Sequence, residues 1–400
     1  MQFQDRINKI FLIGNGFDLA HGLPTKYLDF IKWYLRGCCE KACESSRYED
    51  DCVLVQINRG NFFNRNLDIM EEIDRSFESK EFWKFIDKKE DFDVTSNRPG
   101  KARDTSWDVK IEPKNKFSSN LLLNCHNADW SGIEDEINRI MVKEHTSLVV
   151  NRSTIMIDRR GNSKYNKALE EIKGLNKTVY QLKTKLIEYL SINNSPKECK
   201  DDLLLNESNN NWGRYITNLE GGLKREKLDR DILFLNFNYT TYFKSQVLKE
   251  FHKKFKDAFT SFETIYIHGD LKESIDNIVF GVGDENKEFY SEIESLYDND
   301  WLVPLKSFHY FRNQKYQQLL GFIAKGSYEI YVIGHSCSTT DRTLLNMLFE
   351  NEACDKIHVY HYNGIESYLA TAYNIARNFN DKVRLRKVLQ PFNENLTTVI

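Results

Sequence analysis

The sequence predicts an α/β protein with a doubly wound, mostly parallel β-sheet and a large helical insertion. Two patterns carry this prediction. Short, continuous apolar runs alternate with helical patterns in residues 229–400, and a similar run near the N-terminus ends in two glycines one residue apart. Continuous apolar runs are typical of strands that are covered on both faces. Their alternation with helices is typical of parallel sheets.

The first expected strand is the apolar run 10–13, which leads directly into the turn Gly14-Asn15-Gly16. A strand, a glycine turn and a helix start form a phosphate cradle, because small residues let the backbone approach a pyrophosphate and helix amides point at the anion. Leu19 stands where a full dinucleotide fingerprint has its third glycine, and no strand ends in an acidic residue about 20 positions later. A hydride-transferring dehydrogenase is therefore disfavoured.

Five further apolar runs are expected to be buried strands. They span 232–237, 264–269, 277–283, 329–336 and 356–363. Helical patterns follow or separate several of them and span 242–255, 311–324, 343–349 and 365–379. This order of strands and helices builds a sheet with helices on both faces.

The middle of the chain, residues 37–228, is polar, rich in Asn and Lys and short of strand patterns. We expect a mainly helical insertion lobe here, with a long loop at 86–118. Apolar residues recur at helical spacing over about three heptads, which predicts a long helix. They are Leu169, Ile172, Leu175, Val179, Leu182, Leu186 and Tyr189. We favour packing of this stripe within its own subunit, and a seam between two copies stays open.

The strand before Gly14 needs sheet partners, and good candidates occur only in the last part of the chain. We therefore expect residues 1–36 and 229–400 to form one discontinuous, Rossmann-like nucleotide-binding domain into which residues 37–228 are inserted. In open α/β sheets the ligand binds beyond the carboxyl ends of the strands, near the point where the strand order reverses. The residues that follow the expected strands are thus the candidate site.

Amide and imidazole side chains follow two of these strands. Asn236, Asn238 and Tyr239 come after the first, and an asparagine amide can hold a ribose hydroxyl or orient a water because it donates and accepts. Asparagine also caps turns through its own backbone, so both roles stay open. His268-Gly269 ends the next strand. An imidazole suits general-base work near neutral pH, although a lone histidine at a strand end is more often structural.

A third polar segment, Gly334-His335-Ser336, closes a later strand and is followed by Asp341. Small hydroxyl residues and backbone amides at this place suit a diphosphate or an adenine ribose. The segment does not match the Gly-x-Ser-x-Gly nucleophile elbow. Ser336 is therefore disfavoured as a covalent nucleophile.

Charge and hydropathy exclude several classes of function. The chain has 56 basic and 59 acidic residues and a formal charge of -3 at pH 7, so no global field favours nucleic acid or an anionic membrane. No apolar stretch approaches the roughly 20 residues that span a bilayer. The N-terminus also lacks a secretory signal pattern. We expect a soluble, cytoplasmic protein that engages no membrane and does not favour nucleic acid.

Eight cysteines in 400 residues are too few for a disulfide scaffold. Cys38, Cys39, Cys43 and Cys52 cluster, but without a paired C-x-x-C motif or a close histidine. Buried or inert thiols are favoured over a metal site on this spacing, and no metal is expected.

The first motif resembles the signature of the bacteriophage abortive-infection AbiH family. It reads Gly14-Asn15-Gly16-Phe17-Asp18-Leu19-Ala20-His21-Gly22-Leu23-Pro24-Thr25. The segments 130–134, 236–240, 268–269 and 334–336 follow in the order that this family shows. The resemblance covers both ends of the chain well and the middle poorly. It implies an anti-phage effector that acts in abortive infection.

The same segments are more distantly similar to sirtuin-like NAD-consuming domains. Those domains carry Gly-Ala-Gly, Gly-Ile-Pro, Asn-Tyr-Asp, His-Gly and Gly-Tyr-Ser motifs, which correspond here to 14–16, 22–24, 238–240, 268–269 and 334–336. This resemblance implies a sirtuin-like sheet and places Asn238 and His268 at the catalytic amide and histidine positions. Two departures stand out, because Asn15 replaces an alanine and Thr240 replaces the aspartate. Asp18 or Asn236 would then have to supply the lost ribose contact.

The expected activity is hydrolysis of NAD at the nicotinamide–ribose bond, with NAD as the substrate and without a metal. Asn238 would orient the ribose or the water, and His268 would accept a proton. Two groups of residues are expected to contact the nucleotide. They are Gly14, Asn15, Gly16, Phe17, Asp18, His21, Pro24 and Thr25 in the first motif, and Asn236, Tyr239, Gly269, Gly334, His335 and Ser336 at the later strand ends.

Three questions stay open at this level. The helical insertion is the expected place for contacts between copies or with a regulatory phage or host partner. A non-hydrolytic sensor of NAD or of an ADP-ribose derivative would keep the same cradle. A nucleic-acid-acting defence protein would instead use the Lys- and Asn-rich middle of the chain.

Overall fold

The computed structural model describes most of the chain and divides it into two compact units. The described residues are 7–59, 68–79, 82–84, 86, 92–93, 98–99, 107–125, 130–148, 163–194, 228–249, 252, 259–283 and 287–396. The core unit consists of Met1–Thr25, Leu190–Asn286 and Leu305–Ile400. The inserted unit consists of Lys26–Tyr189 and Lys287–Pro304.

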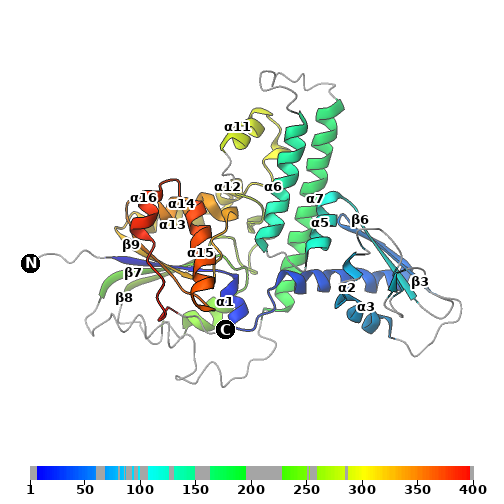
Figure 1. Cartoon of the computed structure of the whole chain (residues 1–400), viewed down its shortest axis with the longest axis horizontal. Coiled ribbons are helices and arrows are strands. Elements are labelled where there is room, and N and C mark those ends of the chain that lie inside the picture. The colour runs from blue at the N-terminus through cyan, green and yellow to red at the C-terminus, as the bar shows by residue number, and fades with distance from the viewer. Residues whose placement is uncertain are drawn as a thin grey trace, which may run out of the picture. The chain divides into compact units, whose positions relative to one another are not determined.

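A five-stranded, fully parallel sheet forms the centre of the core unit (Figure 1). Its strands are β1 Asn8–Ile13, β7 Leu228–Asn236, β8 Phe259–Tyr266, β9 Tyr328–Ile333 and β10 Cys354–Val359. They lie in the order β10-β9-β1-β7-β8. The N-terminal strand therefore sits between two strands from the last part of the chain, as the sequence predicts. Counted along the core unit, this order is 3-2-1-4-5, and it reverses between β1 and β9.

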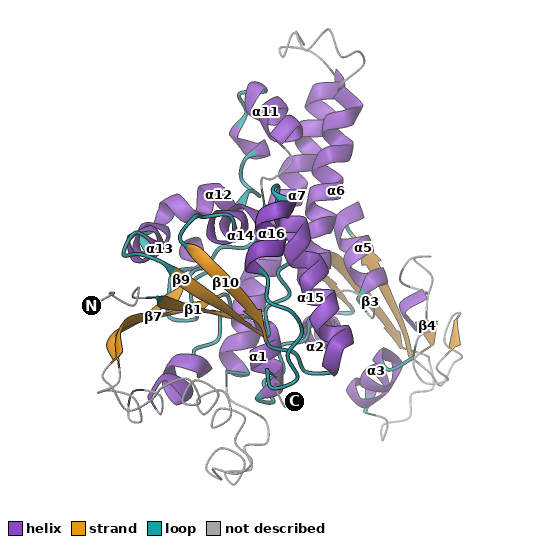
Figure 2. Ribbon diagram, turned by 60° about the vertical axis from the view of Figure 1, so that its left-hand side comes forward, coloured by secondary structure: helices purple, strands orange, loops and turns teal. Residues whose placement is uncertain are grey.

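Helices cover both faces of this sheet (Figure 2). On one face lie α13 Lys315–Ile323, α14 Arg342–Phe349, α15 Gly364–Asn378 and α16 Lys382–Val388. On the other lie α1 Asn15–Ala20 and the π-helix η1 Phe243–Val247. Side chains of β1 alternate between the two cores, because successive residues of a strand point to opposite faces. Ile10 and Leu12 join the first core, and Phe11 and Ile13 join the second.

Short helical turns complete the core unit. They are η2 Ile275–Asn277, α12 Lys306–His309, η4 Tyr310–Arg312 and η5 Thr339–Asp341. The expectation of a strand at 277–283 is wrong, because this apolar run is a buried loop whose one pairing is an isolated bridge from Val282 to Leu305. Its backbone bonds to neighbouring loops instead. The Val279 N–H donates to the His268 carbonyl at 2.9 Å, and its own carbonyl accepts from the Tyr239 hydroxyl at 2.9 Å.

The inserted unit combines helices with a five-stranded antiparallel sheet. The strands are β2 Arg47–Glu49, β3 Val53–Arg59, β4 Phe92–Asp93, β5 Arg98–Pro99 and β6 Trp107–Pro113, in the order β2-β3-β6-β4-β5. The helical elements are α2 Tyr27–Ser45, α3 Ile69–Phe77, α5 Lys116–Asn124, α6 Trp130–Leu148, α7 Ser163–Ile192, α11 Lys287–Ser295 and η3 Asn299–Trp301.

This sheet corrects the expectation of a mainly helical lobe with a long loop at 86–118. Strand β6 and the start of α5 lie inside that range. Trp107, Val109 and Ile111 are buried and alternate with charged residues, which is the alternation of a β-strand. The inserted unit also begins at residue 26 and takes in 287–304, outside the expected 37–228. Residues 195–227 lie outside the described part of the chain.

The predicted long helix is α7, which runs from Ser163 to Ile192. Six residues of its apolar stripe are buried within this one chain. They are Ile172, Leu175, Val179, Leu182, Leu186 and Tyr189. The stripe therefore packs inside its own subunit. Neither α7 nor any other helix in the described ranges is long and apolar enough to cross a membrane.

The clustered cysteines are mostly buried thiols. Cys38, Cys39 and Cys52 are buried and unbridged, and Cys43 is half-buried. Burial raises the pKa of Cys38 to about 12 and raises the pKa of Cys39 and Cys52 as well. These three thiols stay protonated at neutral pH and are therefore weak nucleophiles.

Truncation of Leu12 tests the central position of β1. Leu12 is fully buried in the core beneath α13–α15, so Leu12→Ala should lower the free energy of unfolding by about 2–5 kcal/mol. Ile365→Ala is the matched control because Ile365 is 52% exposed, and it should cost about 0.5 kcal/mol or less. Urea denaturation of both variants measures the difference. Equal losses would contradict a central β1.

Candidate functional site

Loops from four neighbouring strands meet at the carboxyl end of the parallel sheet. The side-chain amide of Asn238, after β7, donates to the Gly14 carbonyl, after β1, at 3.0 Å. The Phe237 ring lies 5.2 Å from the ring of His268, after β8, and 4.1 Å from the ring of His335, after β9. The sequence-predicted site residues of these four loops are thus brought together in one unit.

The glycine turn after β1 packs tightly on the loop after β9. A Cβ added to Gly14 would lie 2.4 Å from the Cα of His335, and one added to Gly16 would lie 2.9 Å from the Cα of Gly334. The Gly16 N–H donates to the Gly334 carbonyl at 2.8 Å. In this structure the small residues therefore allow a close approach between two protein loops, and the Gly16 amide is already engaged. A role of this turn in holding a pyrophosphate stays a prediction.

A buried carboxylate, Asp341, links the residues of this region. Its Oδ1 lies 2.7 Å from the Nζ of Lys306 and 3.2 Å from the Nε2 of His268, while its Oδ2 lies 3.7 Å from the Nε2 of His335. The hydroxyl of Tyr310 is 3.5 Å from the same nitrogen of His268. All five side chains are buried. Lys306 therefore balances a carboxylate that would otherwise be an uncompensated buried charge.

Burial keeps both histidines of this cluster neutral. It lowers the pKa of His268, although Asp341 opposes the shift, and it lowers the pKa of His335 to about 4. Burial alone would raise the pKa of Asp341, but Lys306 and His268 together bring it below its usual value. A proton taken up by His268 would be stabilised by Asp341 and by a hydrogen bond to the backbone of Phe237. Asp341 thus orients the His268 ring and would offset the charge of an imidazolium there.

A second buried carboxylate lies beside Asn238. Thr240 occupies the place where the sirtuin-like pattern has an aspartate, and its hydroxyl donates to the Oδ2 of Asp18 at 2.6 Å. Burial raises the pKa of Asp18 to about 7, against hydrogen bonds from Thr240 and Asn238 that lower it. Helix α1 thus supplies a buried carboxylate beside Thr240 and Asn238.

Asn236 and Asn15 bond to backbone groups of the protein. Asn236 is fully buried, and its side-chain oxygen accepts the N–H of Asn238 at 2.8 Å. This contact is the turn-capping role that the sequence leaves open for Asn236. The amide of Asn15 donates to the carbonyl of Thr25 at 3.2 Å, which closes the first motif on itself.

The other predicted contact residues have varied surroundings. The Nδ1 of His21 lies 2.7 Å from the Phe17 carbonyl, and its ring packs on Phe17 and Tyr242. Pro24 is half-buried, and Ser336 is exposed. Gly269 has a φ of +92°, and a Cβ there would lie 2.7 Å from the Cδ1 of Ile278. The positive φ and the missing side chain of Gly269 therefore allow a tight turn against the 277–283 loop.

Sequence reasoning missed most of the charge cluster. Lys306 and Tyr310 lie in a segment without a recognisable motif, and only the fold carries them to the end of β8. Asp341 is visible in the sequence beside Ser336, but its bond to Lys306 is not. The sequence carries no signal for this pair, because the need of the buried Lys306 for a paired charge is visible only in the fold.

Within the described ranges, no three His, Cys, Asp or Glu side chains stand close enough together to hold a metal ion. The donor set at the candidate site is instead an amide, two imidazoles and a carboxylate that is already paired with Lys306.

The parallel sheet covered by helices on both faces places the chain among the open α/β proteins, a class whose ligand sites generally lie where the strand order reverses. Comparison with known families is more specific. A family model described as "Bacteriophage abortive infection AbiH" matches residues 10–362, and the chain belongs to this family. The match confirms the resemblance that the first motif indicates. No curated protein matches the chain.

The tight packing between the glycine turn after β1 and the loop after β9 can be tested at Gly334. Its φ is +65°, and a Cβ would lie 2.3 Å from the Phe17 nitrogen, so Gly334→Ala should destabilise the protein by roughly 2–4 kcal/mol. Gly326→Ala is the control, because Gly326 also has a positive φ but a Cβ there meets no described atom within 4 Å. Thermal unfolding distinguishes the two. An equal loss of stability in Gly334→Ala and Gly326→Ala would contradict the close packing of these two loops.

The buried Asp18 predicts a pH dependence of stability. Its folded pKa, about 7, lies above the ordinary value of 3.8, so the folded state binds the extra proton between these values. The free energy of unfolding should therefore fall as the pH rises from about 4 to 7, by up to about 1.4 kcal/mol per pH unit.

The Asp18→Asn variant should lack this fall, since an amide keeps the acceptor for Thr240 without the charge. Asp355→Asn is the control, because Asp355 is exposed on β10. Urea denaturation of all three proteins at pH 5, 6, 7 and 8 gives the comparison. A parallel pH profile for Asp18→Asn and the unmodified protein would rule out a buried, proton-binding Asp18.

Proposed function

We propose that this protein is an abortive-infection effector that hydrolyses NAD at the bond between nicotinamide and ribose. Membership of the AbiH family supports an anti-phage role in abortive infection. The observation that carries the enzymatic part is the convergence of Gly14, Asn238 and His268 at the carboxyl ends of β1, β7 and β8. The strand order 3-2-1-4-5 supports it further, because dinucleotides bind at the reversal point of Rossmann sheets with this order.

The reaction requires stabilisation of the ribose and delivery of a water. The C1′–N bond of NAD breaks, its electron pair goes to the nicotinamide nitrogen, and the positively charged ring leaves as neutral nicotinamide. A bond forms between C1′ and the oxygen of the water, and one proton is released. No acid has to protonate the leaving group. The protein must therefore supply an acceptor for the proton and groups that hold the ribose.

His268 is the proton acceptor in this proposal. Its lowered pKa keeps the imidazole neutral at neutral pH, and Asp341 lies 3.2 Å from its Nε2. Lys306 holds Asp341 in place through the same carboxylate oxygen, Oδ1. An imidazolium formed by proton uptake is therefore stabilised without movement of the surrounding charges.

Asn238 and Asp18 are the ribose-holding groups in this proposal. The side-chain oxygen of Asn238 is the acceptor for a ribose hydroxyl or for the attacking water, since its nitrogen donates to Gly14. Asp18 and Thr240 lie next to it and supply the polar contact that an aspartate at 240 would give. The exposed Ser336 is assigned to the far ribose or to a phosphate.

A non-hydrolytic sensor is the competing function, and one observation favours it. The Asn238 amide and the His268 imidazole both make hydrogen bonds to protein groups in this structure. A sensor needs side chains that are held in place in this way and needs no proton acceptor. The two functions differ in one measurable outcome, which is the release of nicotinamide.

The test is incubation of the purified full-length protein with NAD, followed by mass detection of nicotinamide and ADP-ribose. Asn238→Ala and His268→Ala should each lower kcat by about 100-fold or more, because each removes a group that acts on the reacting atoms. Asn299→Ala and His252→Ala are the controls, since both residues are exposed outside the site. They should keep full turnover.

The same variants should be compared in phage-infected cells, where the NAD pool is the readout. The proposal expects a fall in NAD that Asn238→Ala and His268→Ala abolish while circular dichroism shows intact folding. Saturable binding of NAD without product, in the purified protein and in infected cells, would establish the sensor instead. An unchanged NAD pool together with no binding would refute both functions.

A further inference from the structure

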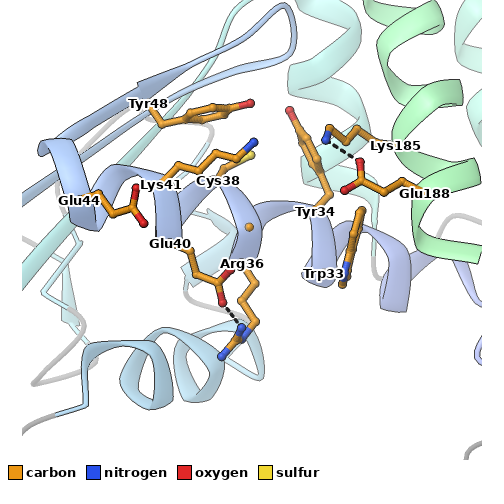
Figure 3. A pocket seen from close by; sticks show the side chains of 11 residues that line it. Trp33, Tyr34, Arg36, Cys38, Glu40, Lys41, Glu44, Tyr48, Lys185 and Glu188 are labelled. Carbon is orange, nitrogen blue, oxygen red and sulfur yellow. Dashed lines mark hydrogen bonds and ion pairs between the residues drawn. The ribbon is translucent and has the colours of Figure 1, made fainter. Parts of the chain in front are cut away.

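A cavity in the inserted unit is independent of the NAD proposal. It has a volume of about 300 Å³ and lies along helix α2, between Tyr48 of β2 and the residues Lys185 and Glu188 of α7 (Figure 3). This volume lies at the lower end of the range for small-molecule pockets. A ligand the size of an amino acid or a single aromatic ring system fits such a space.

Gly37 forms part of the lining of this cavity in the middle of α2. Glycine destabilises a helix interior relative to alanine, so a mid-helix glycine usually has a packing or functional reason. Packing does not supply that reason here, because a Cβ at Gly37 would meet no described atom within 4 Å. The missing side chain leaves open space in the cavity, which points to an occupant that approaches the helix backbone.

The aromatic walls are held rigidly. Tyr34 and Tyr48 both donate their hydroxyls to Asp50, at 2.8 Å and 3.1 Å. The ring of Trp33 packs on that of Tyr189 with centroids 5.3 Å apart. Walls that are fixed before binding lose little entropy when a ligand enters. A flat apolar ring is the ligand group that such walls favour.

The charged groups of the cavity balance one another. Three cations, Arg36, Lys41 and Lys185, face three carboxylates, Glu40, Glu44 and Glu188. Four of these residues form two ion pairs with each other, Lys185 with Glu188 at 2.6 Å and Arg36 with Glu40. A lining without net charge offers nothing to a polyanion such as a nucleic acid.

Lys41 and Glu44 remain after these pairs are counted. Within the described residues neither makes an ion pair, and the ammonium group of Lys41 lies 4.8 Å from the centre of the Tyr48 ring. A cation and a carboxylate that have no ion-pair partner among the described residues, in the lining of one cavity, match a ligand that carries one charge of each sign. Cys38 adds a buried thiol with a pKa raised to about 12, so the cavity holds no thiolate for covalent chemistry.

We propose that this cavity binds a small aromatic zwitterion, that is, a free amino acid with an aromatic side chain. The ring packs between the aromatic walls above Gly37, the carboxylate pairs with Lys41 and the ammonium group pairs with Glu44. The site lies wholly in the inserted unit and uses none of the residues assigned to NAD.

Isothermal titration calorimetry with L-tryptophan tests the proposal on the full chain. L-tryptophan should saturate one site per chain. Tryptamine lacks the carboxylate and indole-3-propionate lacks the amine, so each should bind about tenfold more weakly or worse. Equal affinity for all three would refute a zwitterion site, and tighter binding of AMP would show an anion site instead. No saturation with L-tryptophan, L-tyrosine or L-phenylalanine would overturn the proposal.

Two glycine variants separate the cavity from helix stability. Gly37→Ala places a methyl group in the open space and should abolish binding of L-tryptophan. Gly174→Ala is the matched control, since Gly174 lies inside α7, has no described atom within 4 Å of an added Cβ and does not line the cavity. Both variants should raise Tm by about 1–2 °C. Unchanged binding to a well-folded Gly37→Ala variant would place the ligand elsewhere and contradict the proposal.

Discussion

Strand β1 pairs on both sides, with β7 and with β9, and the architecture of the core unit depends on this double pairing. Ile13, its last residue, is in register with Asn236 on one side and Ile333 on the other. The loops that leave these three positions therefore start at one level. Because parallel strands all end at the same edge, the pairing itself brings Gly14, Asn238 and the 334–336 segment together, before any side chain of the site makes a contact.

Burial patterns explain which strands the sequence could and could not predict. Continuous apolar runs marked β1, β7, β8, β9 and β10, since strands buried on both faces need such runs. The run at 277–283 looked alike but is a loop, because buried apolar side chains are also required under a loop that packs on a core. In the inserted unit, β6 alternates with period two, yet charged neighbours on both sides hid this pattern inside an apparent loop.

Within the candidate site, motif residues were predictable and their partners were not. Asn238 and His268 follow strands directly, so their positions depend only on the sheet. Lys306 and Thr240 enter the site through tertiary contacts, with Asp341 and Asp18 respectively. Both partners neutralise or hold a buried carboxylate, a requirement that arises only once the chain is folded. The contacts that stabilise buried carboxylates are therefore what local sequence patterns did not reveal.

The long interval between β1 and its second partner has a consequence for synthesis of the protein. Residues paired across β1 and β9 are 320 positions apart in the chain, and contacts of such separation form late because loop closure must precede them. During synthesis on the ribosome, only one edge of β1 can form backbone hydrogen bonds after β7 has emerged. The other edge stays unpaired until β9 is made. Asp341 follows later still. Prematurely terminated chains thus lack the assembled loops, and a cell that makes such fragments is not exposed to whatever chemistry the finished sheet performs.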